Sequence, residues 1–445
     1  MESNVSRMCP VAGAGPIFPS NKPRPQAASP RAEAAILGPT PDVWARHGVG
    51  RDDFLNTPWY IHKLWQTLHQ NGVDADYVNG SVLQEATVED EKLNYGPMSY
   101  RVLFVAEMQS IEPATAEAIR DFARAGGTVV FIGNTPKRSA GYHNAHRNDR
   151  RVTEAIDDAL RLGGGQVQVV SSPEKDELLQ WTRSVLDEFG VDPVVEISPA
   201  DPKLFQVHHE KDGRDIFFFT NQSGQRTISF TAEFDTGNKT PWRWDPQTGE
   251  RAVYPHRGAR NNLEITLKPL ESLLLVFEPN LTGEPAEQTQ VTRERGRRIR
   301  GPWKLALKPV EGEPFTRNLE ELVDLGSADD RDLRTFGGTV TYRTTFSLDR
   351  TRPMKLDLGE VHGVADVTVN GQPVGVRWWG EPLLDVTDEL KEGENVLEVK
   401  VATVLFNLCR SMEDNPVATR WVNMSGRKEP VEAGLVGPVE LYPVE

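Results

Sequence analysis

The chain has 445 residues, too many for one compact core, so about two to four domains are expected. Its hydrophobic content of 38% and charged content of 26% are typical of a soluble globular protein, and no apolar run approaches the ~20 residues that span a bilayer. The formal net charge of -15 repels phosphate backbones, so we predict neither nucleic acid nor a membrane as a partner.

Residues 1–33 are rich in Pro, Ala and Ser and contain no apolar segment of the kind found in secretory signals. We interpret them as a disordered lead-in, and the chain as it stands is expected to be cytoplasmic. Cys9 and Cys409 are too few for a disulfide framework or a zinc cluster, so we interpret both as free thiols.

Residues 34–200 alternate between strand and helix patterns, which predicts a doubly wound α/β domain. Continuous apolar runs at 100–107 and 128–134 are typical of buried parallel strands. Helices are expected to begin at Thr57-Pro58 and at Pro113. The carboxyl ends of the strands, where such sheets bind ligands, show neither a Gly-rich phosphate loop nor a Cys or Ser nucleophile elbow.

His143 and His146 lie in a polar stretch that we interpret as a surface loop. Their H-x-x-H spacing could place two imidazoles on one helical face, but a metal would need a third ligand nearby. We favour the loop, and predict no metal ligands from the sequence.

Residues 201–280 change to short alternating strands and predict a small β-sandwich, with a hairpin that turns at Asp212-Gly213. The neighbouring His208 and His209 would point to opposite faces of their strand, so we interpret them as ordinary strand residues. The basic run within residues 281–301 is interpreted as a solvated linker, or as a strand that docks on an acidic neighbour.

Residues 302–445 again show short alternating strands and predict a β-sandwich or jelly roll. One hairpin, DVTVNGQPVGVRWWG, turns at Asn370-Gly371 and ends in Trp378 and Trp379. Because adjacent residues of a strand point to opposite faces, one Trp is expected in the core and the other at the surface or in a groove, next to Arg377.

The phrases TVTYRTTF, LDLGEVHGVADVTVNGQPVGVRWWGEPLLDVTDEL and GLVGPVELYP together resemble the galactose-binding-like jelly roll of glycoside hydrolases. They are most similar to the C-terminal domain of the α-L-rhamnosidases of glycoside hydrolase family 106, and are also like the sugar-binding domains of family 2 glycosidases. VHHEKDGRDIFFFTNQSG resembles the small β-sandwich of the rhamnosidases, and SYRVLFVAEMQSIEPATAEAIRDFARAGGTVVFIG resembles their amidotransferase-like α/β domain. The resemblance runs from about Ala34 to the end of the sequence.

In those rhamnosidases the catalytic carboxyl groups belong to a (β/α)8 barrel of ~250 residues upstream of the matching domains. The resemblance therefore implies no catalytic residue in this chain. It implies a fragment that acts in carbohydrate recognition or in assembly, either with a catalytic-barrel partner or as a homo-oligomer. The alternatives are a free-standing carbohydrate-binding protein, and an active glycoside hydrolase whose carboxylates the sequence does not identify.

The resemblance implies four residues that bind a rhamnose-containing glycan: Arg377, Trp378, Trp379 and Asn407. Trp stacks on the apolar face of a pyranose and Arg donates to its hydroxyls. The alternative is that the tryptophans serve packing in the core and against a neighbouring domain. Asn407 matches the family pattern, but Leu408 stands where the family has Arg. No cofactor is implied, apart from a structural calcium ion for which the sequence shows no clear ligand set.

Overall fold

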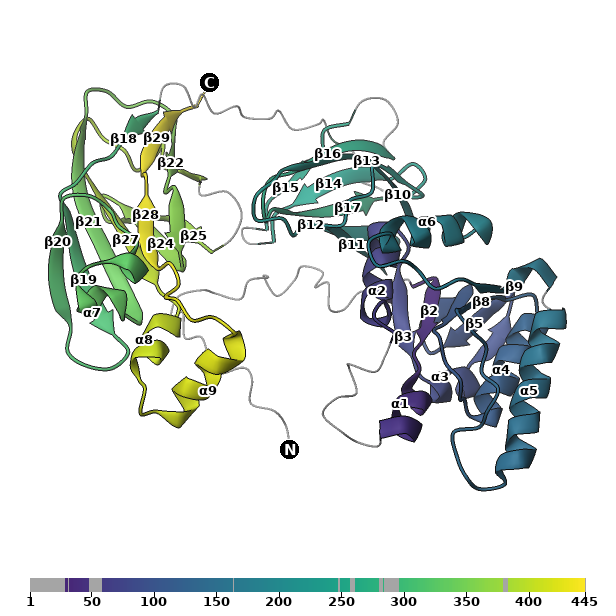
Figure 1. The fold of residues 1–445 in the computed structure, drawn as a ribbon. Coiled ribbons are helices and arrows are strands. Elements are labelled where there is room, and N and C mark those ends of the chain that lie inside the picture. Colours follow the sequence, from purple (N-terminus) through teal and green to yellow (C-terminus); the bar gives the residue numbers. More distant parts are fainter. Residues whose placement is uncertain are drawn as a thin grey trace. The chain divides into compact units, whose positions relative to one another are not determined.

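The computed structural model describes residues 29–30, 32–47, 58–162, 164–246, 249–256, 261–279, 283, 296–378 and 383–444. The chain divides into two compact units, Met1–Ala286 and Glu287–Glu445, each with its own hydrophobic core (Figure 1). Within these described ranges, no helix combines the length and the apolar character that a membrane crossing requires.

The first unit contains a parallel five-stranded sheet whose three central strands are buried on both faces, as their continuous apolar sequences require. In spatial order the strands are β3 (Ala75–Val78), β2 (Ala34–Leu37), β7 (Val102–Val105), β8 (Thr128–Ile132) and β9 (Val167–Val170). This confirms the predicted α/β character, and the order reverses between β2 and β7.

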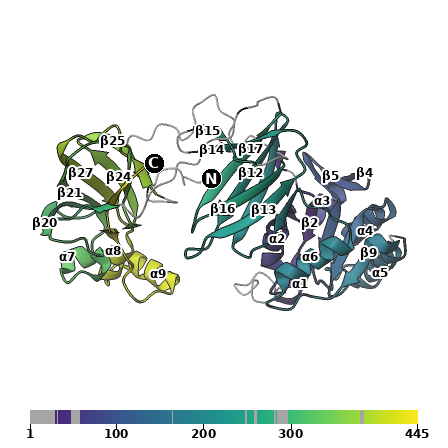
Figure 2. The same cartoon turned by 90° about the horizontal axis from the view of Figure 1, so that it is seen from above.

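Helices cover both faces of this sheet (Figure 2). One face packs against α2 (Ile61–Gln70) and α6 (Leu178–Glu188), and the other against α4 (Pro113–Arg124) and α5 (Ala145–Leu162). The remaining small elements are α1 (Thr40–His47), α3 (Gly80–Glu85), and the antiparallel strands β4 (Thr87–Glu89), β5 (Lys92–Tyr95) and β6 (Met98–Tyr100).

The predicted helix starts differ in accuracy. Pro113 is the first residue of α4, as expected, whereas α2 begins at Ile61 rather than at Pro58. The polar loop predicted around His143 and His146 ends early, because α5 already begins at Ala145. Its first turns are polar, and the apolar face that packs on the sheet starts only at Val152.

The first unit also contains a β-sandwich, as predicted, with a core of interlocking phenylalanines. Its larger sheet has the order β1 (Ser29–Pro30), β11 (Leu204–Lys211), β12 (Arg214–Asn221), β17 (Ser272–Glu278), β14 (Thr240–Trp244), β15 (Arg251–Val253). The smaller sheet has the order β10 (Val195–Ser198), β13 (Ile228–Phe234), β16 (Asn262–Leu267). The hairpin turn at Asp212-Gly213 is confirmed by two positive φ angles, 52° and 74°.

The second unit is an antiparallel β-sandwich closed around one core. One sheet has the order β20 (Phe315–Leu319), β19 (Trp303–Pro309), β21 (Gly338–Leu348), β27 (Gly393–Ala402), β24 (Val364–Val369), β25 (Gln372–Arg377). The other has the order β18 (Arg297–Arg298), β29 (Glu440–Pro443), β22 (Met354–Asp357), β26 (Leu383–Asp385). A further pair joins β23 (Glu360–His362) to β28 (Gly434–Gly437).

Part of the predicted basic linker belongs to this sandwich, because Arg297 and Arg298 of β18 pair with Leu441 and Glu440 of β29. Three short helices complete the unit: α7 (Arg331–Arg334), α8 (Phe406–Ser411) and α9 (Pro416–Ser425). Helices α8 and α9 lie between β27 and β28, in a stretch for which the sequence patterns predicted no helix (Figure 1).

Candidate functional site

The hairpin of β24 and β25 leads to Arg377 and Trp378, two of the four residues predicted to bind sugar. Its turn residues Asn370 and Gly371 both have positive φ, as predicted. The Asn370 side chain donates to Glu389 O (2.7 Å) and accepts from Val396 N (3.0 Å), so the turn is fixed to the sandwich. Arg377 is half-buried at the end of β25, and Trp378 directly after it is 57% exposed. Trp379 lies outside the described residues.

Asn407, the fourth predicted sugar ligand, is buried at the start of α8 and is only 3% exposed. Its side-chain amide donates to Val431 O at 2.7 Å and accepts from Val431 N at 2.9 Å. This amide therefore fixes the backbone just before β28, whereas Trp378 presents its ring to solvent from the hairpin.

Next to α9 lies an open surface pocket. It is lined by Glu413, Asp414, Pro416, Thr419, Arg420, Asn423 and Met424. Two carboxylates, a guanidinium and an amide are groups that can hydrogen-bond sugar hydroxyls. The same helix also exposes Val417 and Trp421. Sequence reasoning missed this pocket, although Asn415-Pro416 is a helix-start signal and Asn415 does cap α9 by accepting from Val417 N and Ala418 N.

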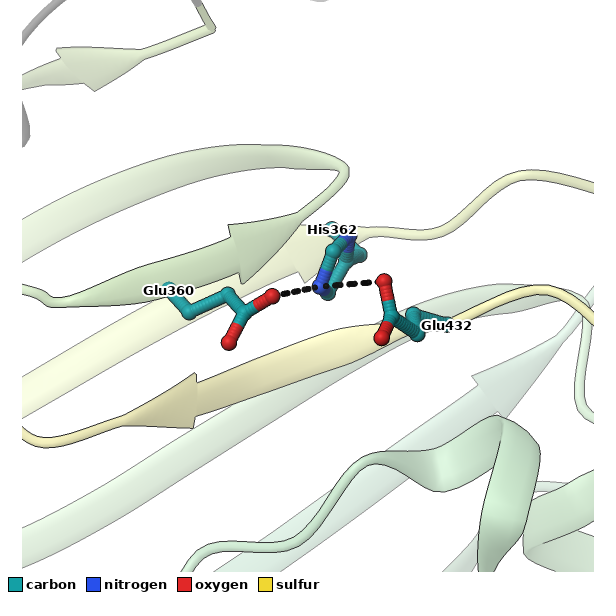
Figure 3. A group of neighbouring side chains, drawn as sticks. All are labelled: Glu360, His362 and Glu432. Carbon is teal, nitrogen blue, oxygen red and sulfur yellow. Dashed lines mark hydrogen bonds and ion pairs between the residues drawn. The ribbon is translucent and has the colours of Figure 1, made fainter. Parts of the chain in front are cut away.

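The second unit also contains a cluster of one histidine and two glutamates (Figure 3). Glu360 and His362 lie on β23, and Glu432 lies just before β28. His362 Nε2 lies 2.9 Å from Glu360 Oε1 and 3.3 Å from Glu432 Oε2. The three potential ligand atoms lie within 4.8 Å of one another. It is the one such group of His, Cys, Asp and Glu among the residues that the structure describes, and the sequence analysis did not find it.

In the first unit, the carboxyl edge of the parallel sheet carries Glu107 just after β7. Tyr60 Oη and Ser172 Oγ donate to Glu107 Oε2 at 3.3 Å and 3.2 Å. Burial, and then the charge of Glu107, raise the pKa of the Tyr60 phenol, so the phenol stays protonated and keeps donating. This arrangement is a carboxylate that accepts from two hydroxyl groups, one of them the serine hydroxyl of Ser172.

A buried polar cluster joins the α/β part of the first unit to its β-sandwich. His69 Nδ1 lies 3.1 Å from Asp74 Oδ1 and 3.0 Å from Gln206 O, while His69 Nε2 accepts from Ala75 N at 3.2 Å. Since both neighbours of Nδ1 are acceptors, His69 is assigned as the Nδ1–H tautomer. Gln206 Nε2 donates to Asp74 Oδ1 at 3.0 Å.

The two sandwich histidines differ in environment. His208 is buried, stacks on Phe217 at 4.3 Å and lies 3.1 Å from Asp215 Oδ1. His209 is half-buried, and burial lowers its pKa. On α5, His146 is exposed, and in the preceding turn His143 Nε2 contacts Asn144 Nδ2 at 2.9 Å; these two histidines are not part of a metal-ligand cluster among the described residues.

Comparison with known proteins adds the family. Residues 54–256 match the glycoside hydrolase 106 family model, whose description is alpha-L-rhamnosidase. The chain is related to rhamnosidase-type glycoside hydrolases. A rhamnosidase structure from Novosphingobium sp. PP1Y aligns with 94% of the chain at a TM-score of 0.63 and 24% identity, which supports the sheet-rich α/β fold. The resemblance to α-L-rhamnosidases predicted from the sequence is thereby confirmed.

The relatives are much longer than this chain. The alignment covers 39% of the Novosphingobium rhamnosidase. A Formosa agariphila protein named "Putative beta-glucuronidase" is 28% identical, over 68% of this chain and 30% of its own length. The chain therefore spans about a third of the length of these two relatives.

Proposed function

We propose that this chain forms a non-catalytic part of an α-L-rhamnosidase-type glycoside hydrolase and recognises carbohydrate through its second unit. The match of residues 54–256 to the rhamnosidase family model carries the proposal. On this view the parallel sheet with its helices is the amidotransferase-like domain, and the sandwich of the second unit is the sugar-binding jelly roll.

Bond cleavage in such enzymes needs two carboxyl groups that flank the glycosidic bond, one to protonate the leaving oxygen and one to attack or to activate water. In a barrel enzyme they stand at the carboxyl ends of eight parallel strands. The parallel sheet that the structure describes is open and has five strands. We therefore place the cleaving pair outside the described residues, on a catalytic-barrel partner or segment.

Trp378 and Arg377 are the residues proposed to contact the sugar. An exposed indole offers a flat apolar face to a pyranose ring, and a neighbouring guanidinium donates to ring hydroxyls. Trp379 completes the proposed set from outside the described residues. Asn407 is proposed to support the fold of this unit rather than to contact the sugar, since its amide is already bound to Val431.

The test is calorimetric titration of the full chain with L-rhamnose and with an aryl α-L-rhamnoside. Trp378→Ala should weaken binding by roughly three- to tenfold, because an aromatic contact contributes about 0.5–1.5 kcal/mol to the free energy of binding. Trp421→Ala is the matched control, because Trp421 is exposed in the same unit at 66%. Equal affinity in both variants, or equal loss in both, would refute the role of Trp378.

Release of nitrophenol from the same aryl rhamnoside separates the remaining functions. We expect no turnover above a heat-treated sample. Steady turnover would favour an active hydrolase, and Glu413→Gln and Asp414→Asn would then be the first variants to make, since both carboxylates line the pocket beside α9. Binding without turnover fits both a free-standing carbohydrate-binding protein and a part of a larger enzyme; co-purification with a rhamnosidase barrel distinguishes these two.

A further inference from the structure

The Glu360–His362–Glu432 cluster brings three metal-binding side chains together from distant parts of the second unit (Figure 3). Glu360 and His362 are two residues apart on β23, and His362 Nε2 lies 2.9 Å from Glu360 Oε1. Glu432 approaches from the segment before β28, the strand that pairs with β23. Figure 3 shows both carboxylates directed at the same imidazole nitrogen.

The backbone on either side of Glu432 is held by one buried and one half-buried side chain. Asn407 binds both backbone groups of Val431, and Asp324 Oδ1 accepts from Ala433 N at 2.8 Å. Glycine is required where this segment packs closest, since a Cβ on Gly326 would lie 2.1 Å from Val431 O. Glu432 thus starts from a fixed backbone position, which lowers the entropy cost of binding a ligand there.

Ligand chemistry identifies the class of ion. A single imidazole nitrogen carries at most one proton, yet two carboxylate oxygens face Nε2 here, so a divalent cation satisfies this arrangement better than a proton does. One nitrogen and two carboxylate oxygens suit Zn²⁺, whereas Ca²⁺ and Mg²⁺ take oxygen ligands. Tetrahedral Zn²⁺ with bonds of ~2.1 Å separates its ligands by roughly 3.4 Å. The two observed nitrogen–oxygen separations of 2.9 Å and 3.3 Å are close to that value.

We propose that Glu360, His362 and Glu432 bind a zinc-class divalent cation, with water as the fourth ligand. The ion would cross-link β23 to the end of the segment that carries α8 and α9 and would stabilise that connection. This inference is independent of the proposed carbohydrate function.

The experiment is titration of ZnCl2 into the EDTA-dialysed full chain, followed by calorimetry and by the melting temperature. We expect one tight site, a rise in melting temperature on Zn²⁺ addition, and at least a tenfold weaker site in His362→Ala. Co²⁺ substitution should give visible ligand-field bands that His362→Ala abolishes. Glu432→Gln is the second variant, needed if His362→Ala alters the fold in EDTA.

His146→Ala controls for adventitious binding, because His146 is an exposed imidazole in the first unit. This control should bind Zn²⁺ as the wild type does. Equal affinity and stoichiometry in wild type and His362→Ala, or a loss confined to His146→Ala, would overturn the proposal. Tighter binding of Ca²⁺ than of Zn²⁺ would overturn the assigned class of ion.

Discussion

Two carboxylate–imidazole clusters, one in each unit, show how burial changes the meaning of the same groups. In the first unit, Asp74 is 3% exposed and is surrounded by His69, Gln206 and His208. In the second unit, Glu360 and Glu432 are exposed around a half-buried His362. Oδ1 of the buried carboxylate has protein partners that replace water, and its Oδ2 lies 3.7 Å from His208 Nδ1. The exposed carboxylates remain available to an outside cation.

The difference follows from desolvation. A carboxylate removed from water costs several kcal/mol unless charged or hydrogen-bonding partners compensate, so the buried cluster is expected to stabilise the joint between the α/β part and the sandwich of the first unit. An exposed group keeps its hydration and contributes little until it binds something. The predictions that follow test this contrast, beginning with the largest expected effect.

Asp74→Ala should lower the free energy of unfolding of the first unit by about 3–5 kcal/mol, because it leaves a buried imidazole and a buried amide without their shared acceptor. Urea unfolding at pH 7 measures the change. Glu117→Ala is the control, since its ion pair with Arg151 is exposed and should be worth no more than ~1 kcal/mol. Similar losses in both variants would remove the contrast between buried and exposed clusters.

Asn407→Ala should cost the second unit about 1–3 kcal/mol, because two buried backbone groups of Val431 lose their partner. Thermal unfolding gives the magnitude, and Asn423→Ala, an exposed amide on α9, is the matched substitution. At temperatures where it is folded, Asn407→Ala should bind rhamnose like the wild type. A selective loss of sugar affinity would instead return Asn407 to the sugar site.

The buried cluster should also be sensitive to acid. Burial alone would raise the pKa of Asp215, but the hydrogen bonds from His208 and Lys239 outweigh it and lower that pKa. A carboxyl with a lowered folded-state pKa stabilises the fold above its unfolded pKa of ~3.9, and that contribution disappears as pH falls below it.

The urea concentration at the midpoint of unfolding, measured from pH 7 to pH 3, should therefore decrease once the pH is lower than about 4. The decrease should be less steep in Asp215→Asn. If the urea midpoint of the variant decreases at low pH as steeply as that of the wild type, the contacts of Asp215 do not stabilise its ionised form.

The smallest effect is expected for Glu360→Gln measured in EDTA. Its carboxylate is exposed, so the free energy of unfolding should change by less than ~0.5 kcal/mol. Chemical denaturation of the full chain gives the free energy of unfolding with Zn²⁺ and without it. A loss above ~1 kcal/mol without metal would show that this cluster is already a structural ion pair.

Local signals predicted the parts of the fold that local residues determine. The Asn370-Gly371 and Asp212-Gly213 turns were predicted because residues with positive φ are nearly confined to Gly, Asn and Asp. Helix α9 was missed because it buries Ala418 alone and therefore shows no amphipathic pattern. Helix α5 was not predicted either, because its opening turns are polar and were interpreted as a surface loop.

The two clusters could not be predicted, since their members meet only through the tertiary fold. Gln206 and Asp74 are 132 positions apart in the sequence, and neither stands in a recognisable motif. The resemblance did supply Trp378 and Asn407, but a sequence pattern does not reveal exposure. The structure assigns the two residues opposite environments: one ring in solvent, and one amide in the interior.

The pairing of β18 with β29 has a consequence for protein engineering. The first and last strands of the second unit are antiparallel neighbours in one sheet, so the polypeptide enters and leaves this unit along the same edge. A module with adjacent ends can be transplanted into a surface loop of another protein, or reopened at the Asn370-Gly371 turn by circular permutation, without stretching its backbone.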